Sequence, residues 1–174
     1  RLGYRGYTQG AIQTDSCFYQ NIQGALDAGL DVGVYFFSQA ITPEEARQEA
    51  DYVLSLLESY PITCPVVYDW EPITFAEGAR TDQLENEVLT QCAAAFCQQI
   101  AQAGYTPAVY FNQEMGYFSF DLKELSPFQF WLAEYDSYPS FYYGFTMWQY
   151  THEGRVDGIQ TPVDWNLDFS GLKR

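Results

Sequence analysis

Basic residues are scarce in this sequence. It has 8 Lys and Arg against 23 Asp and Glu among 174 residues, which gives a net charge of −15. Because no basic cluster is available to neutralise phosphates, the composition argues against a nucleic-acid partner. The same lack disfavours binding to an anionic membrane surface.

Metal-ligating and membrane-spanning patterns are also missing. The sequence has a single histidine, His152, and its four cysteines, Cys17, Cys64, Cys92 and Cys97, form no CxxC pair. We therefore expect no metal, no cofactor and four free thiols, which leaves the redox compartment open. No signal peptide, transmembrane run or low-complexity linker is visible.

Aromatic residues, by contrast, are abundant. The 15 Tyr, 13 Phe and 4 Trp make up 18% of the chain, and hydrophobic residues in total make up 47%. This is enough for one well-packed domain over residues 1–174. Aromatic rings also stack on the apolar faces of sugars, although core packing is the commoner role of any single ring.

The hydrophobic pattern predicts strands alternating with helices, followed by strands alone. A helix that opens with Thr42 as N-cap and Pro43 in its first turn is the clearest of the helices. Strand–helix repeats whose later members lack the helix predict an α/β fold, namely an irregular TIM-like (β/α)5(β)3 barrel. The predicted helices cover 15–28, 42–57 and 84–103, and the predicted strands cover 32–37, 65–71, 107–112, 130–134, 146–150 and 163–167.

Two acids close the predicted strand 65–71. Asp69 and Glu71 lie two residues apart, so they should face one side of the sheet while Tyr68 and Trp70 face the other. Their Cβ atoms would be roughly 6–7 Å apart. Repulsion and desolvation should keep one of the two protonated, which is the arrangement that a glycosidase uses. The alternative is a strand that ends in ordinary solvated acids.

Polar and aromatic residues also end the other predicted strands. The carboxyl ends of barrel strands form the active site, so we expect these residues to meet in one cleft. We interpret Trp148 as the strongest candidate for sugar binding and His152 as a surface residue. The candidate substrate-binding residues are Tyr35, Tyr110, Trp131, Trp148, Gln149 and Asp164.

Three motifs in this order resemble glycoside hydrolase family 25, the muramidase-type lysozymes. They are the segment 24–37, the triplet 69–71, and a C-terminal motif made of the segments 147–150, 156–159 and 163–166. The resemblance implies hydrolysis of the β-1,4 bond between N-acetylmuramic acid and N-acetylglucosamine in peptidoglycan. It also implies a secreted or wall-associated enzyme whose partner is the glycan strand.

The resemblance suggests roles for the acids. Glu71 is expected to be the general acid, with a pKa raised by Asp69 and by the apolar wall. Asp69 is expected to stay ionised and to stabilise positive charge on the sugar or orient its N-acetyl group. A neighbouring-group route through that acetamide would remove the need for a protein nucleophile. Asp164 is expected to be a third acid in the cleft.

The start of the chain departs from the family pattern. Residues 1–7 resemble the end of the second strand of the family barrel, so the resemblance predicts a barrel that is incomplete at the N-terminus and lacks one active-site aspartate. Two other functions stay open. One is a different barrel glycosidase, such as a chitinase-like enzyme, although the residues before Asp69 lack the aspartate series of that family. The other is an inactive peptidoglycan-binding relative.

Overall fold

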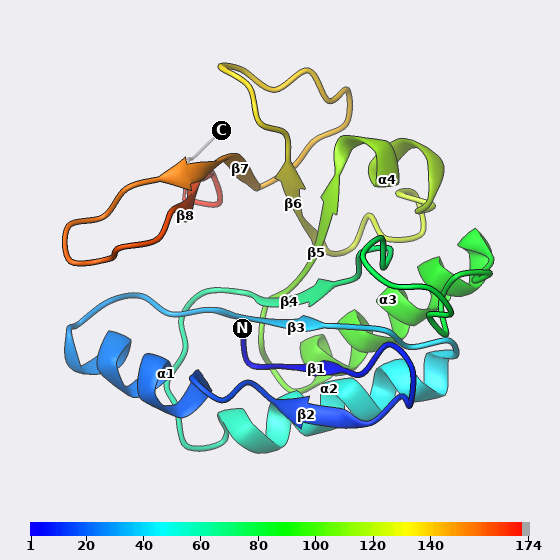
Figure 1. The fold of residues 1–174 in the computed structure, drawn as a ribbon, viewed down its shortest axis with the longest axis horizontal. Coiled ribbons are helices and arrows are strands. Elements are labelled where there is room, and N and C mark those ends of the chain that lie inside the picture. The colour runs from blue at the N-terminus through cyan, green and yellow to red at the C-terminus, as the bar shows by residue number, and fades with distance from the viewer. Residues whose placement is uncertain (172–174) are drawn as a thin grey trace.

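A computed structural model describes residues 1–171 of the chain and shows one eight-stranded sheet in the order β2-β1-β3-β4-β5-β6-β7-β8 (Figure 1). The strands β1, β3, β4, β5, β6 and β7 run parallel, whereas β2 and β8 pair antiparallel at the two ends of this order. The elements are β1 (Gly3–Arg5), β2 (Ile12–Thr14), α1 (Phe18–Asp27), β3 (Val34–Phe37), α2 (Pro43–Leu57), β4 (Val66–Asp69), α3 (Asn86–Gln102), β5 (Pro107–Asn112), α4 (Gln113–Phe118), β6 (Gln129–Ala133), β7 (Met147–Gly154) and β8 (Val163–Asp168).

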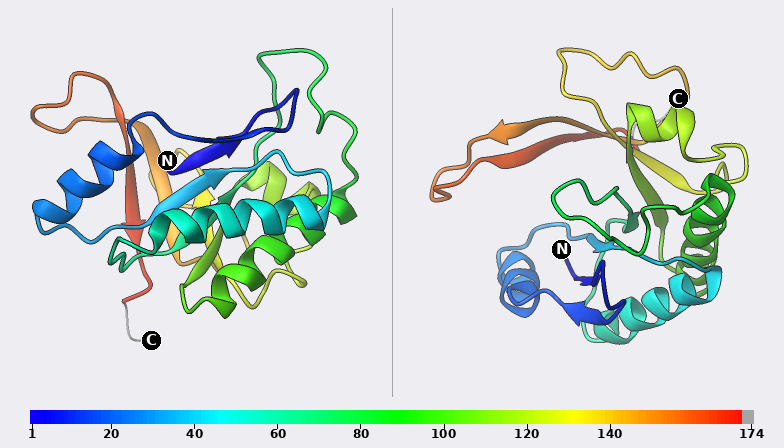
Figure 2. Two further views of the ribbon diagram at one scale, coloured as in Figure 1. Left: turned by 90° about the horizontal axis from the view of Figure 1, so that it is seen from below. Right: turned by 45° about the vertical axis from the view of Figure 1, so that its right-hand side comes forward.

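The predicted α/β fold is confirmed. All six predicted strands form, and each pairs with the next one along the chain. Figure 2 shows that the sheet is strongly curved, with the β7–β8 hairpin and β1 on opposite arms of the curve. The helices α2 and α3 lie side by side on its outer side, as in an irregular barrel.

The start of α2 follows the predicted capping chemistry. The side-chain oxygen of Thr42 accepts a hydrogen bond of 3.2 Å from the backbone amide of Glu45, and Pro43 occupies the first turn. The Glu45 carboxylate reaches back to the amide of Ile41 at 2.9 Å, one residue before the usual partner in a capping box. These bonds fix the loop between β3 and α2, which borders the open side of the sheet.

Two elements were not predicted. The strand β2 forms a hairpin with β1, and the short helix α4 follows β5 directly. Asn112 caps α4, because its side-chain oxygen accepts a bond of 2.9 Å from the amide of Met115. Six residues are too few to show a helical period in the sequence.

The two faces of the sheet have different environments. Alternate side chains of the parallel strands point outward into the hydrophobic core under the helices, and the others point into the curve of the sheet. Tyr68 and Trp70 lie in the core, as predicted, and Asp69 lies on the other face. The core-facing strand residues are Val34, Phe36, Val66, Tyr68, Val109, Phe111, Phe130, Leu132 and Trp148.

The cysteines are free, as predicted, but they are not uniformly half-buried. Cys92 and Cys97 are buried on α3, Cys64 is intermediate and Cys17 is exposed. Among the described residues, no helix is long and apolar enough to cross a membrane.

Candidate active site

A cavity of about 90 Å³ opens on the inner face of the sheet. It brings together residues from six strands and the turn after β4, so side chains up to 129 positions apart in sequence share one space. The prediction that Asp69 and Glu71 open into the same cleft is confirmed. The lining residues are Tyr35, Asp69, Glu71, Tyr110, Trp131, Gln149 and Asp164.

Asp69 is the deepest acid of this cavity. It ends β4, and only 6% of its surface is exposed. Its Oδ1 atom has no hydrogen-bond partner within the described part of the chain. Burial raises the pKa of Asp69 well above its ordinary value, and the neighbouring Glu71 charge raises it further.

Glu71 lies two residues beyond Asp69, after the strand has ended, and is only half-buried. Burial raises its pKa as well, and the second cause is the charge of Asp164. Asp69 and Glu71 interact as predicted, since the Glu71 charge raises the pKa of Asp69. The charge that raises the pKa of Glu71 is that of Asp164, which β8 carries across to this side. The expectation that Asp69 stays ionised is wrong, because burial favours the neutral form of both acids.

Gln149 and two tyrosines form the opposite wall. The hydroxyls of Tyr110 and Tyr135 donate to the Gln149 side-chain oxygen at 3.0 and 2.8 Å. The Trp131 ring packs edge-on against Tyr110, with centroids 5.3 Å apart, and its indole nitrogen donates to Asn166 at 2.9 Å. These contacts hold flat aromatic surfaces beside the acids, which suits a sugar ring.

Tyr135 and Asn166 are among the polar residues that end the predicted strands, but they are not among the predicted substrate-binding residues. Both were accessible to reasoning by position, because Tyr135 follows the end of β6 by two residues and Asn166 follows Asp164 by two residues on β8. Strand alternation therefore places Asn166 on the same face as Asp164.

The prediction that Trp148 lines the sugar-binding cleft is wrong. It is 6% exposed and lies in the hydrophobic core, where its indole nitrogen donates to the carbonyl of Glu134 at 2.8 Å. Alternation along β7 sends neighbouring side chains to opposite faces, so only Gln149 reaches the cavity. His152 is exposed, as predicted, and its ring packs on Tyr135 with centroids 4.5 Å apart.

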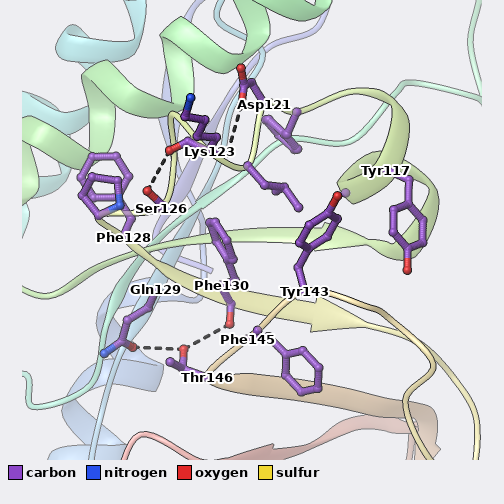
Figure 3. A pocket seen from close by; sticks show the side chains of 15 residues that line it. Tyr117, Asp121, Lys123, Ser126, Phe128, Gln129, Phe130, Tyr143, Phe145 and Thr146 are labelled. Carbon is purple, nitrogen blue, oxygen red and sulfur yellow. Dashed lines mark hydrogen bonds between the residues drawn. The ribbon is translucent and has the colours of Figure 1, made fainter.

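A larger groove of about 870 Å³ lies on the other side of β6 (Figure 3). Phe130 lines this groove, whereas its neighbour Trp131 lines the smaller cavity. Among the described residues that line the groove, the one acid is Asp121, and its carboxylate accepts backbone amides at 2.9 and 3.3 Å. The groove therefore offers aromatic surface but no pair of acids, and the smaller cavity is the candidate active site.

Comparisons with known proteins identify the family of the chain. The family model for glycosyl hydrolases family 25 matches residues 4–159. The autolytic lysozyme of Clostridium acetobutylicum is 26% identical over 166 residues, which cover 95% of this chain and 48% of that protein.

Solved structures share the fold. The modular autolysin LytC from Streptococcus pneumoniae aligns with a TM-score of 0.76 at 23% identity, over 95% of this chain and 38% of that one. The bacterial lysozyme from Streptomyces coelicolor aligns with a TM-score of 0.68 at 22% identity, over 95% of this chain and 76% of that one. The chain thus spans less than half the length of the Clostridium relative and of LytC. With the family model covering most of its length, the chain belongs to glycosyl hydrolase family 25.

Proposed function

We propose that residues 1–174 form a catalytic domain that hydrolyses the β-1,4 bond between N-acetylmuramic acid and N-acetylglucosamine in peptidoglycan. The observation that carries the proposal is the meeting of Asp69 and Glu71 in one cavity, with burial favouring a protonated carboxyl. Membership of family 25 supports the reaction class. LytC, a relative of the same fold, has been solved in complex with a synthetic peptidoglycan ligand, which supports the substrate.

Glu71 is the general acid in this proposal. It is the more accessible of the two close acids, and its raised pKa keeps a proton available. The proton passes to the glycosidic oxygen as the bond from that oxygen to the anomeric carbon breaks. Water then adds to the anomeric carbon and returns a proton to the Glu71 carboxylate.

Asp69 and Asp164 act on the positive charge that develops on the sugar. Asp69 lies at the bottom of the cavity, where its unpartnered oxygen can accept the N–H of a 2-acetamido group. That contact would orient the acetamide for a neighbouring-group route. The positive charge that develops on the acetamide would favour the ionised form of Asp69, which would then stabilise that charge. Asp164 faces Glu71 from β8 and holds the acid's proton more tightly.

Because the proposed substrate is wall glycan, we expect the protein to act outside the cell that makes it. The aromatic walls formed by Tyr35, Tyr110 and Trp131 offer sugar-stacking surfaces.

The experiment is digestion of purified Gram-positive cell walls, with newly formed reducing ends identified chemically. The proposed reaction releases reducing N-acetylmuramic acid. Glu71→Gln should lower the rate about 100-fold or more, because it removes the proton donor. Glu77→Gln, which changes an exposed glutamate on the following loop, is the matched control and should leave the rate unchanged.

Two outcomes would favour the alternatives. Reducing N-acetylglucosamine ends would indicate a different glycosidase. Wall binding without any new reducing ends would indicate an inactive binding relative.

A further inference from the structure

The Gln149 side chain is held in one orientation. It is 4% exposed, and its amide oxygen accepts both the Tyr110 hydroxyl, at 3.0 Å, and the Tyr135 hydroxyl, at 2.8 Å. An amide oxygen has two lone pairs, so these two donors saturate it.

The amide nitrogen of the same side chain has no such partner. Among residues 1–171, no hydrogen bond to another protein group uses the Gln149 Nε2 atom, although Gln149 lines the cavity that holds Asp69 and Glu71. The Nε2 atom is not among the fully buried side-chain atoms that lack a partner, so it keeps access to open space. Because Gln149 lines the cavity, its free N–H groups face the space that a substrate would fill.

Both tyrosines keep their protons in this environment. Burial raises the pKa of the Tyr110 hydroxyl, and the charges of Glu71 and Asp69 raise it further. Burial also raises the pKa of the Tyr135 hydroxyl, with Asp164 and Glu71 adding to it. The two O–H groups thus remain donors to the Gln149 oxygen at any pH at which the protein works.

We propose that Tyr135 is a positioning residue: together with Tyr110 it fixes the Gln149 amide so that Nε2 donates to an acceptor oxygen of the bound sugar. The inference rests on the proposed function, since it assigns a contact within the same cavity. The acceptor is either the carbonyl oxygen of a 2-acetamido group or a sugar hydroxyl. Both are neutral oxygen acceptors.

Tyr135 differs from Tyr110 in how it acts. Tyr110 lines the cavity itself, whereas Tyr135 stands on the rim, 52% exposed, with its ring packed on His152. Replacing Tyr135 by Phe removes the hydroxyl and keeps the ring. The Gln149 oxygen would then lose one of its two donors and the amide could rotate.

The test is a binding and kinetic cycle with a peptidoglycan tetrasaccharide of alternating N-acetylglucosamine and N-acetylmuramic acid. Tyr135→Phe should raise the dissociation constant about 3- to 10-fold, as expected for one hydrogen bond. Binding is measured in the Glu71→Gln background, so the ligand is not cleaved. Tyr138→Phe, on the same loop and 70% exposed, is the control and should change nothing.

The double variant separates positioning from a general structural effect. Gln149→Ala should weaken binding at least as much as Tyr135→Phe, and adding Tyr135→Phe to it should cause no further loss. Fully additive losses, or an unchanged dissociation constant for Tyr135→Phe, would overturn the inference. Failure of the wild type and of every variant to bind the tetrasaccharide would also overturn the inference.

Two further arms complete the design. A de-N-acetylated tetrasaccharide identifies the acceptor: if the effect of Tyr135→Phe disappears, the acceptor is the acetamide oxygen, and if it persists, the acceptor is a hydroxyl. Because binding is measured without turnover, a wild type that binds the tetrasaccharide but cleaves nothing would refute the proposed reaction, and the effects of Tyr135→Phe and Gln149→Ala on binding would still decide the positioning role.

Discussion

Asp69 and Glu49 are both buried carboxyl groups, but their surroundings differ. Glu49, on the core side of the sheet, is 0% exposed, and the Arg5 guanidinium donates to it at 2.6 Å. Asp69, on the cavity side, is 6% exposed, its Oδ1 atom has no partner among the described residues, and the charge beside it is another acid, Glu71. Each acid has one buried oxygen without a hydrogen-bond partner among the described residues, but Glu49 is compensated by a cation and Asp69 is not.

The difference distinguishes a buried acid with a structural role from a buried acid in the candidate active site. Arg5 also donates to the carbonyls of Gly10 and Glu45, so the ion pair joins β1, the β1–β2 turn and α2. Burial raises the pKa of Glu49 to about 7 in spite of this partner. Within residues 1–171 no hydrogen bond or ion pair uses the Asp69 carboxylate, so its burial costs stability without a comparable structural return. A perturbed acid of this kind in a cavity is typical of an active site.

Breaking the compensated pair should have the largest effect on stability. Arg5→Ala leaves Glu49 buried without a cation, and we expect the free energy of unfolding to fall by about 3–5 kcal/mol at pH 8. Urea denaturation measures it. Arg47→Ala is the control, because Arg47 pairs with Glu44 at 3.4 Å on the surface and should cost less than about 0.5 kcal/mol. Equal losses would mean that the buried pair has no special structural role.

Changing the uncompensated acid should affect activity and not stability. Asp69→Asn keeps the shape of the side chain and removes its ability to ionise as positive charge develops on the sugar, so the rate of wall hydrolysis should fall about 100-fold, as for loss of an electrostatic stabiliser. The free energy of unfolding should stay the same or rise, since an unpartnered acid is removed. Asp157→Asn, in the exposed β7–β8 turn, should change neither. A marked loss of stability in Asp69→Asn would show that Asp69 has a structural role after all.

The contrast between these acids was only partly visible in the sequence. Alternation along a short apolar strand predicts that Asp69 and Glu71 share a face and that Tyr68 and Trp70 take the other, and the structure agrees. This works because the period of a strand is two residues, whatever the tertiary context. The same rule separates Trp148 from Gln149, and choosing both as sugar contacts was inconsistent with it.

Other features depend on contacts across the fold. The charge that raises the pKa of Glu71 comes from Asp164, 93 residues away, and depends on the antiparallel return of β8. Tyr135 can be placed at the carboxyl end of its strand by position, but its hydrogen bond to Gln149 depends on how the loop after β6 lies against β7. The pairing of Arg5 with Glu49 joins a strand to a helix 44 residues later, and the sequence does not distinguish it from other pairs of opposite charge.

Replacing Asp164 should change the pKa of the general acid, Glu71, without removing its carboxyl group. The general acid must be protonated, so the rate should fall as pH rises through the pKa of Glu71. Because Asp164 raises that pKa, Asp164→Asn should shift the fall to lower pH, measured as the rate of wall hydrolysis from pH 4 to 9. The Asp157→Asn profile is the reference. A wild-type rate that climbs steadily from pH 6 to 9 would contradict a carboxylic-acid donor altogether.

At pH 4.5, the smallest effect should come from neutralising Glu49 while keeping its shape. The folded-state pKa of Glu49 is about 7 against an ordinary value of 4.5, so its contribution to stability is fully present below pH 4.5 and is lost as pH rises through 7. Glu49→Gln cannot ionise and should lose this dependence, while its amide oxygen can still accept from Arg5. At pH 4.5 the variant should match the wild type within about 1 kcal/mol in urea denaturation. Between pH 4.5 and 7 the wild type should lose stability relative to the variant, and above pH 7 the difference should stay constant. If the wild type instead gained stability relative to the variant across this range, Arg5 would more than offset the burial of Glu49, and the two acids would differ even more than the structure indicates.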